Sequence, residues 1–275
     1  MNPFLDVARP LALAAAKRLM ELRQSTLVRE RKADHSLVTN ADRDADQIIR
    51  QGLHKAFPEH AVLTEESGRQ GPSNAQYVWV VDPLDGTRAY AKGTVGFSVM
   101  IGLLKDSEPI AGVVADPLEG HLYEAALGEG CWYSTLTPAL SLRRERVHVS
   151  NRRELNEMPI VTSTGFPETL HGLIAEQLHG PWVPAVNSVG IKVGLVVRQV
   201  ADIYINHHSV HYWDTCAPQI ILEEAGGRFS FLDGSAITYD LESDYRHHGP
   251  TLATNNQRHA DLTKILQPLM RPAES

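Results

Sequence analysis

The chain has 275 residues, of which 43% are hydrophobic and 21% charged, as in a globular protein with a large core. No uncharged apolar run reaches about 18 residues, which excludes a membrane-spanning helix, so no membrane partner is expected. The net charge of −7 argues against a nucleic acid polymer as main partner, although a metal site could still attract a small anion. The two cysteines, Cys131 and Cys216, give neither a disulfide framework nor a zinc site, which fits a reducing cytoplasm.

The first half of the chain combines two helices with a series of strands. Apolar residues at helical spacing predict an amphipathic helix over residues 3–27 and a second one over 40–56, just before Pro58. Runs rich in β-branched residues, separated by Gly and Asp-Pro, predict strands at 61–63, 77–81, 95–104, 110–115 and 121–125. This pattern is typical of a meandering, largely antiparallel sheet.

From about residue 147, strands and helices alternate. Strands are predicted at 147–150, 160–163, 202–206, 228–232 and 252–254, and helices at 168–179, 188–200, 215–225 and after the last strand. We therefore predict an α/β (α+β) protein in two halves, residues 1–143 and 144–275, joined through a polar, Arg-rich stretch at 140–147.

The run Asp82-Pro83-Leu84-Asp85-Gly86-Thr87 follows the apolar strand at 77–81. A Pro/Asp/Gly cluster in this place is a good turn sequence. Two carboxylates three residues apart can also converge, together with the Leu84 carbonyl, on a hard cation such as Mg²⁺. Gly86 and Thr87 would then present backbone N–H groups suited to a phosphate. On local grounds, a turn and a metal site are equally good interpretations.

Three more acidic positions gain meaning only beside that run. Taken alone, Glu65 follows a short strand and would be solvated. Asp42 fits a helix capping box that begins at Thr39, and Asp214 stands at a favoured N-cap position. Together with the two aspartates of the run, Glu65 and Asp214 could hold two or three cations around one phosphoryl group, which is the arrangement for in-line displacement.

Four motifs in this order resemble those of the inositol monophosphatase-like superfamily, a group of magnesium-dependent, lithium-sensitive phosphatases. They are T-x-x-D at 39–42, T-E-E-S at 64–67, W-V-V-D-P-L-D-G-T at 79–87 and W-D-T-C-A at 213–217. The resemblance covers nearly the whole chain. It implies a layered α/β/α/β/α fold of the inositol monophosphatase and fructose-1,6-bisphosphatase type, and a cytoplasmic enzyme that is commonly a homodimer. It also implies Mg²⁺ as cofactor, with two or three ions per active site.

The resemblance implies roles for individual residues. Thr87, with Glu65, would orient the attacking water, and Asp42 would support Thr87. Gly86 and Thr87 would bind the phosphate through their backbone amides. The first half would then supply most metal ligands, and the second half Asp214 and the substrate pocket. The metal ligands would be Glu65, Asp82, Leu84 through its carbonyl, Asp85 and Asp214.

Substrate choice depends on residues that follow the metal motifs. The element S-V-G-I-K at 188–192 resembles one in 3′(2′),5′-bisphosphate nucleotidases, and Arg88 stands where these enzymes carry a basic residue. Arg88, Ser188 and Lys192 are therefore candidate substrate contacts. Arg88 would otherwise be a surface residue, and Lys192 would extend to solvent.

Two departures weaken this assignment. Ala89 replaces the usual Glu, and Asn206-His207-His208 stands where that branch often has Pro-Arg. A histidine binds a second phosphate only when it is protonated or donates as a neutral ring. His207 is a candidate contact, but the segment that also contains His208 and His211 would fit a solvated loop too.

Three functions remain open at this point. The best candidate is hydrolysis of a 3′(2′),5′-bisphosphate nucleotide, with 3′-phosphoadenosine 5′-phosphate as the single best substrate. The second is the hydrolysis of inositol 1-phosphate or another sugar or polyol phosphate. The third is a non-catalytic, metal-dependent binder of a phosphorylated ligand. In all three, the partner is a small phosphorylated metabolite.

Overall fold

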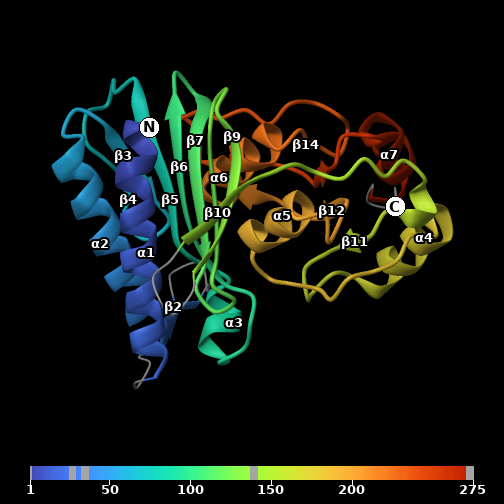
Figure 1. Cartoon of the computed structure of the whole chain (residues 1–275), viewed down its shortest axis with the longest axis horizontal. Helices are drawn as coiled ribbons and strands as arrows, with labels where there is room; N and C mark the ends of the chain where they lie inside the picture. Colours follow the sequence, from blue (N-terminus) through green and yellow to red (C-terminus); the bar gives the residue numbers. More distant parts are fainter. Residues whose placement is uncertain (1, 25–28, 32–36, 137–141, 271–275) are drawn as a thin grey trace.

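The computed structural model describes residues 2–24, 29–31, 37–136 and 142–270. It shows five alternating layers of helix and sheet (Figure 1). Two helices cover one face of a large sheet, two more separate this sheet from a small one, and two pack outside the small sheet. In this order the helices are α1 (Pro3–Arg23) and α2 (Asn40–Ala56), α5 (Val189–Val197) and α6 (Tyr212–Glu224), and α4 (Glu168–Leu178) and α7 (His259–Leu266). The predicted α/β/α/β/α fold is confirmed.

The large sheet has eight strands in the order β10-β9-β8-β7-β6-β5-β3-β4. All neighbours are antiparallel except the parallel pair β3 and β5, so the predicted meander is confirmed. The strands are β3 (Ala61–Thr64), β4 (Gly68–Gln70), β5 (Tyr77–Asp85), β6 (Ser98–Lys105), β7 (Glu108–Asp116), β8 (His121–Ala126), β9 (Gly130–Leu136) and β10 (Leu142–Val147).

The small sheet has the order β11-β12-β16-β14, with β11 and β12 parallel and the other pairs antiparallel. Two short ribbons complete the described strands, β1 with β2 and β13 with β15, and a one-turn helix, α3, follows β5. The bounds are β1 (Arg29–Arg31), β2 (Leu37–Thr39), α3 (Thr87–Ala91), β11 (Ile160–Val161), β12 (Ile203–Asn206), β13 (Val210–His211), β14 (Arg228–Phe231), β15 (Arg246–His247) and β16 (Thr251–Thr254).

Two glycines let α6 approach the large sheet closely. A Cβ atom on Gly102 of β6 would lie 2.5 Å from the sulfur of Cys216, and one on Gly112 of β7 would lie 2.6 Å from Ile220. Cys216 and Ile220 belong to α6, so a larger residue in either strand would push this helix away. The close packing fixes the beginning of α6, where Asp214 lies, relative to the end of β5.

Several predicted boundaries differ from the structure. The first helix ends at Arg23, and residues 25–27 of its predicted range lie outside the described residues. The strand predicted at 147–150 is wrong beyond Val147, where β10 ends. The helix predicted to begin at 215 begins at Tyr212. Asp214 is therefore the third residue of α6 and not its N-cap.

The predicted boundary between the two halves, at 143/144, lies inside β10. Residues of both halves also share one core between the two sheets, with Met100 and Tyr123 from the large sheet and Val193 and Ile220 from α5 and α6. The division into halves stays a prediction, and the change from one sheet to the other comes after Val147.

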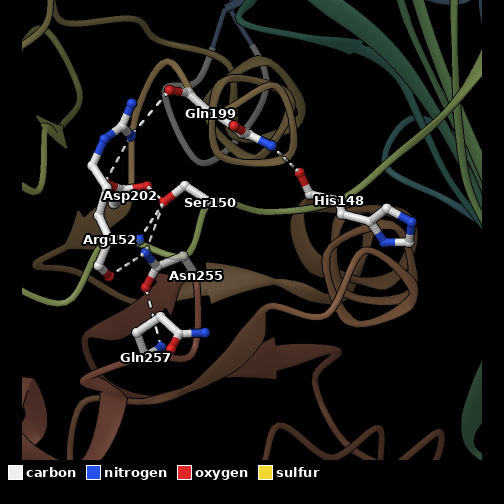
Figure 2. Close-up of polar contacts among 7 residues, drawn as sticks. All are labelled: His148, Ser150, Arg152, Gln199, Asp202, Asn255 and Gln257. Carbon is white, nitrogen blue, oxygen red and sulfur yellow. Dashed lines mark hydrogen bonds and ion pairs between the residues drawn. The ribbon is translucent and has the colours of Figure 1, made fainter.

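The chain that leaves β10 is fixed by a buried polar network around Asp202 (Figure 2). The Asp202 carboxylate pairs with Arg152 at 3.0 Å and accepts a hydrogen bond from the Ser150 hydroxyl. Asn255, next to β16, donates to Ser150 and to the Arg152 carbonyl, each at 3.0 Å. Because Asp202 directly precedes β12, the network ties this segment to two strands of the small sheet.

His259 makes stability depend on pH. The residue is 5% exposed, and its ring hydrogen-bonds to Ser230 at 2.7 Å and to Thr254 at 2.9 Å. Burial lowers the pKa of His259 from 6.5 to about 4. Below pH 6.5 this histidine is protonated in the unfolded chain but stays neutral in the folded protein. The free energy of unfolding therefore falls as the pH drops toward 4, by roughly 3 kcal/mol for this group. We expect His259→Gln to lose this component.

Urea unfolding at pH 7 and pH 4.5 would measure it, because the difference between wild type and variant cancels the other titrating groups. The stability advantage of the wild type at pH 7 should shrink at pH 4.5. An advantage that does not change with pH would contradict the buried, neutral state of His259.

Candidate active site

Three carboxylates from distant parts of the chain meet at one point. One oxygen each of Asp82, Asp85 and Asp214 lies within 4.8 Å of the others. Asp82 and Asp85 are at the end of β5, where the pairing with β6 shifts register, and Asp214 is in the first turn of α6. The run at 82–87 is therefore a bulged strand end followed by a short helix, and its carboxylates form part of a cluster.

The cluster opens into a cavity of about 870 Å³. Glu65, just after β3, lines the same cavity and hydrogen-bonds through its backbone N–H to the Val81 carbonyl at 3.2 Å. Leu84, Gly86 and Thr87 also line it. The structure thus brings together all the residues predicted to hold metal ions.

Asp85 is held by the beginning of α5. Its Oδ2 atom accepts hydrogen bonds from the Ser188 hydroxyl at 2.7 Å and from the backbone N–H groups of Val189 at 2.6 Å and Gly190 at 3.3 Å. Ser188 is fully buried and its hydroxyl also contacts that of Ser98 at 2.9 Å. The structure therefore makes Ser188 a residue that orients Asp85, which differs from the predicted contact with substrate.

The cluster is electrostatically strained without cations. Burial, followed by the charges of Glu65, Asp85 and Asp214, raises the pKa of Asp82 well above its ordinary value. Burial and the Asp85 charge raise the pKa of Asp214 to about 8. Carboxylates that repel one another in a buried site are stabilised by a hard divalent cation, which prefers oxygen ligands. The donor set therefore fits Mg²⁺ or a similar ion, with Glu65, Asp82, Leu84, Asp85 and Asp214 as its candidate ligands.

Thr87 is linked to Asp42, which lies in the first turn of α2. The Thr87 hydroxyl lies 3.1 Å from Oδ1 of Asp42 and 3.1 Å from the Leu84 carbonyl. The second oxygen of Asp42 accepts hydrogen bonds from the N–H of Thr39 at 2.7 Å and its hydroxyl at 2.6 Å. Burial raises the pKa of Asp42, and these hydrogen bonds oppose the rise because they stabilise the carboxylate. Asp42 is thus both the predicted helix cap and the partner of Thr87.

Gly86 takes a backbone conformation that only glycine adopts readily. Its φ is 91°, and a Cβ atom there would lie 2.5 Å from the Gly96 carbonyl oxygen. This conformation turns the chain from β5 into α3, whose first residue is Thr87. The turn places the Gly86 and Thr87 backbone at the cavity, as their predicted role in binding phosphate requires.

Two basic side chains stand at one rim of the cavity. Arg88 and Lys92 are both exposed and both line the cavity; Arg88 is the second residue of α3, and Lys92 is the C-cap of this helix. Sequence reasoning found Arg88 but missed Lys92. The spacing of four residues from Arg88 becomes informative only once α3 is known, because residues four apart share one face of a helix.

Histidines line another part of the cavity. His207, His208 and His211 all contribute to its lining, beside Phe166, which meets the His207 ring at 5.1 Å, and Trp213, on which His211 stacks. Burial lowers the pKa of His207, which favours the neutral ring. The segment thus belongs to the cavity wall and is not a loop remote from the site.

Lys192 has a different position from the one predicted. Its side chain is fully buried, and its ammonium group donates to the Ser163 hydroxyl at 2.8 Å, the Asn187 carbonyl at 2.9 Å and the Val186 carbonyl at 3.1 Å. An ammonium group has three donors, so all are used by protein acceptors. Lys192 therefore neither extends to solvent nor points a free donor at a ligand.

Comparison with known proteins agrees with this site. The sequence profile of the inositol monophosphatase family matches residues 1–271, so the chain belongs to this family. It is 29% identical to an inositol monophosphatase from Anabaena of known structure, with a TM-score of 0.79 over 98% of this chain and 97% of that one. The family comprises metal-dependent phosphatases that hydrolyse small phosphomonoesters, and this chain is such a phosphatase.

Relatives at similar identity have different names. The chain is 29% identical to the Nus factor SuhB of Pasteurella multocida, over 85% of this chain and 87% of that protein. It is 28% identical to the 3′(2′),5′-bisphosphate nucleotidase CysQ of Aggregatibacter actinomycetemcomitans, over 86% and 87%. These similarities confirm the family but do not identify the substrate of this chain. Among the described residues, none of the helices is long and apolar enough to cross a membrane.

Proposed function

We propose that the chain is a Mg²⁺-dependent phosphomonoesterase whose substrate carries a second anionic group, with 3′-phosphoadenosine 5′-phosphate as the best candidate. The observation that supports this choice is a cavity shared by the carboxylate cluster and the exposed cations Arg88 and Lys92. Two or three Mg²⁺ ions at the cluster would attract the reacting phosphoryl group, and the rim cations would attract a second anionic group.

Metal ions and protein groups would each contribute to hydrolysis at this cavity. Bound Mg²⁺ would activate water and neutralise the charge that develops on the phosphoryl group. If the Thr87 hydroxyl donates its proton to Asp42, its lone pairs are free to accept a hydrogen bond from the attacking water. Glu65 lines the same cavity and would help to orient that water. The backbone N–H groups of Gly86 and Thr87 would bind phosphate oxygens.

The proposal predicts a preference for the bisphosphate substrate that depends on Arg88 and Lys92. We expect kcat/KM for 3′-phosphoadenosine 5′-phosphate to exceed that for inositol 1-phosphate, and the variant with Arg88→Gln and Lys92→Gln to lose at least about tenfold on the bisphosphate, or ~1.4 kcal/mol of transition-state binding. The same variant should change little on a monophosphate that has no second charge. A double variant at two exposed lysines outside the cavity, Lys55→Gln with Lys264→Gln, serves as the charge-matched control.

Other outcomes would favour the alternatives. If kcat/KM for inositol 1-phosphate is about tenfold higher than for the bisphosphate, the hypothesis of a polyol phosphatase replaces the first one. Thr164 and Asn187 supply a specific reason for it, because their polar groups line the cavity and suit sugar hydroxyls. If the wild type releases no phosphate from any phosphomonoester with Mg²⁺, a non-catalytic binder replaces both proposals.

Further properties stay proposals from the family resemblance: lithium inhibition, a homodimer and a cytoplasmic location. The free, buried thiols of Cys131 and Cys216 are compatible with a reducing compartment. The net charge of −7 supports a small-molecule partner over a nucleic acid polymer. Phosphate release with and without lithium, and sedimentation of the purified protein, would test the first two.

A further inference from the structure

Lys192 is a buried cation that touches only neutral acceptors. Its ammonium group is bonded to the Ser163 hydroxyl and to the carbonyls of Val186 and Asn187, and lies 4.9 Å from the centre of the Tyr204 ring. Burial of a charged amine costs several kcal/mol unless its donors are satisfied. The three hydrogen bonds and the aromatic face, together with the nearby charges of Asp85 and Asp214, offset this cost. The hydrogen bonds depend on the surrounding backbone keeping its shape.

The acceptors belong to two segments that are distant in sequence and adjacent in space. Ser163 follows β11, whereas Val186 and Asn187 precede α5. The segments also meet directly, through the Val186 N–H and Thr162 carbonyl at 3.0 Å and through a hydrogen bond from Thr164 to Asn187. Lys192 thus links the two segments, because its ammonium group donates hydrogen bonds to both of them.

The bridged segments form a wall of the active-site cavity. Ser163, Thr164, Gly165 and Asn187 all line it. Asp85, by contrast, is held by Ser188 and by the backbone of α5 itself, through bonds that do not involve Lys192. A loss of the Lys192 bridge should therefore disturb the wall more than the carboxylate cluster.

We propose that Lys192 is a positioning residue that fixes the segments 162–165 and 186–187 as one wall of the cavity, and thereby sets the fit of the part of the substrate beyond its reacting phosphoryl group. The kinetic part of the test rests on the proposed function, whereas the structural part does not. Lys192 acts through the wall and has no contact of its own with substrate.

The test compares Lys192→Met, which keeps an unbranched side chain one atom shorter and removes its donors, with Lys192→Arg, Ser163→Ala and the exposed control Lys264→Met. In Lys192→Met we expect KM to rise about tenfold, because the wall is no longer held in one geometry and substrate binding weakens by ~1.4 kcal/mol, with kcat within about threefold. Inhibition by inorganic phosphate should be nearly unchanged, because phosphate alone does not reach the wall. Ser163→Ala should raise KM less, and its effect should not add to that of Lys192→Met.

Amide hydrogen exchange of the substrate-free protein decides between positioning and direct contact. Positioning predicts faster exchange at 162–165 and 186–187 in Lys192→Met and partial restoration in Lys192→Arg. Wild-type exchange in these segments together with a raised KM would overturn the proposal in favour of a direct substrate contact. If Lys192→Met does not fold, exchange and KM of Ser163→Ala decide, and no change in either would overturn it. Absence of phosphatase activity in the wild type would overturn the proposed function. The hydrogen-exchange rates at 162–165 and 186–187 would then test the positioning role of Lys192 by themselves.

Discussion

Asp82→Asn should lower Mg²⁺-dependent phosphate release at least ~10³-fold while the protein remains folded. Asp82 is 2% exposed, and its pKa is raised by burial and by the charges of Glu65, Asp85 and Asp214. Asparagine keeps the shape of the side chain but removes one negative charge from the cluster. The variant would therefore bind the cation poorly, and with it the phosphoryl group.

The same substitution should affect stability in the opposite direction. In the absence of metal, the removal of one of several mutually repelling carboxylates should raise the melting temperature or leave it unchanged. Mg²⁺ should stabilise the wild type, because it binds the folded state, and stabilise Asp82→Asn much less. Thermal unfolding with Mg²⁺ and with a chelator measures both effects. Exposed Asp244→Asn is the matched control. A variant that keeps wild-type turnover would show that the cluster is not the catalytic site.

Thr87→Val should lower kcat by about 10²-fold or more and leave the affinity for Mg²⁺ nearly unchanged. Valine has nearly the shape of threonine but lacks the hydroxyl that lies 3.1 Å from Asp42. Without it, the hydrogen bond that the Thr87 oxygen would accept from the attacking water is lost, and Glu65 alone would orient that water. The measurements are kcat with saturating Mg²⁺ and the Mg²⁺ concentration that gives half of the maximal rate.

A double-mutant cycle with Asp42→Asn separates orientation from packing. Because Asp42 acts through Thr87, the double variant should be little slower than Thr87→Val alone. Thr169→Val, on the exposed face of α4, controls for the loss of a hydroxyl. Additive losses in the cycle would mean that Asp42 has a separate role. Asp42→Asn should also cost some stability, because Asp42 completes the helix capping box with Thr39.

Much of the site was predictable because its residues lie in short motifs. The order of Asp42, Glu65, the run at 82–87 and Asp214 sufficed to predict the reaction class and the metal ligands that the structure brings together. Local patterns also gave the correct type for most helices and strands, since apolar periodicity reflects which face of an element is buried. Boundaries were less accurate at Val147 and Tyr212, where hydrogen bonds to distant segments end or begin an element.

The hydrogen-bond partners of Ser188 and Lys192 were decided by tertiary structure alone. In sequence both belong to one motif that resembles a substrate-binding element, and their chemistry suits phosphate. In the fold, Ser188 is bonded to Asp85 and the three donors of Lys192 are used by Ser163, Val186 and Asn187. Whether a polar group can bind substrate depends on which partners already occupy it, and those partners come from other parts of the chain.

The sequence by itself therefore determined the family and the layered fold, and it predicted the acidic residues that the structure brings together, because each is encoded in periodicity or in a compact motif. The tertiary structure decided which polar groups face the cavity. It placed Lys92 and the histidines at 207, 208 and 211 in the lining and left Lys192 beneath it. The physical reason is that burial and hydrogen-bond partners arise from packing between layers, and no local pattern in the chain specifies them.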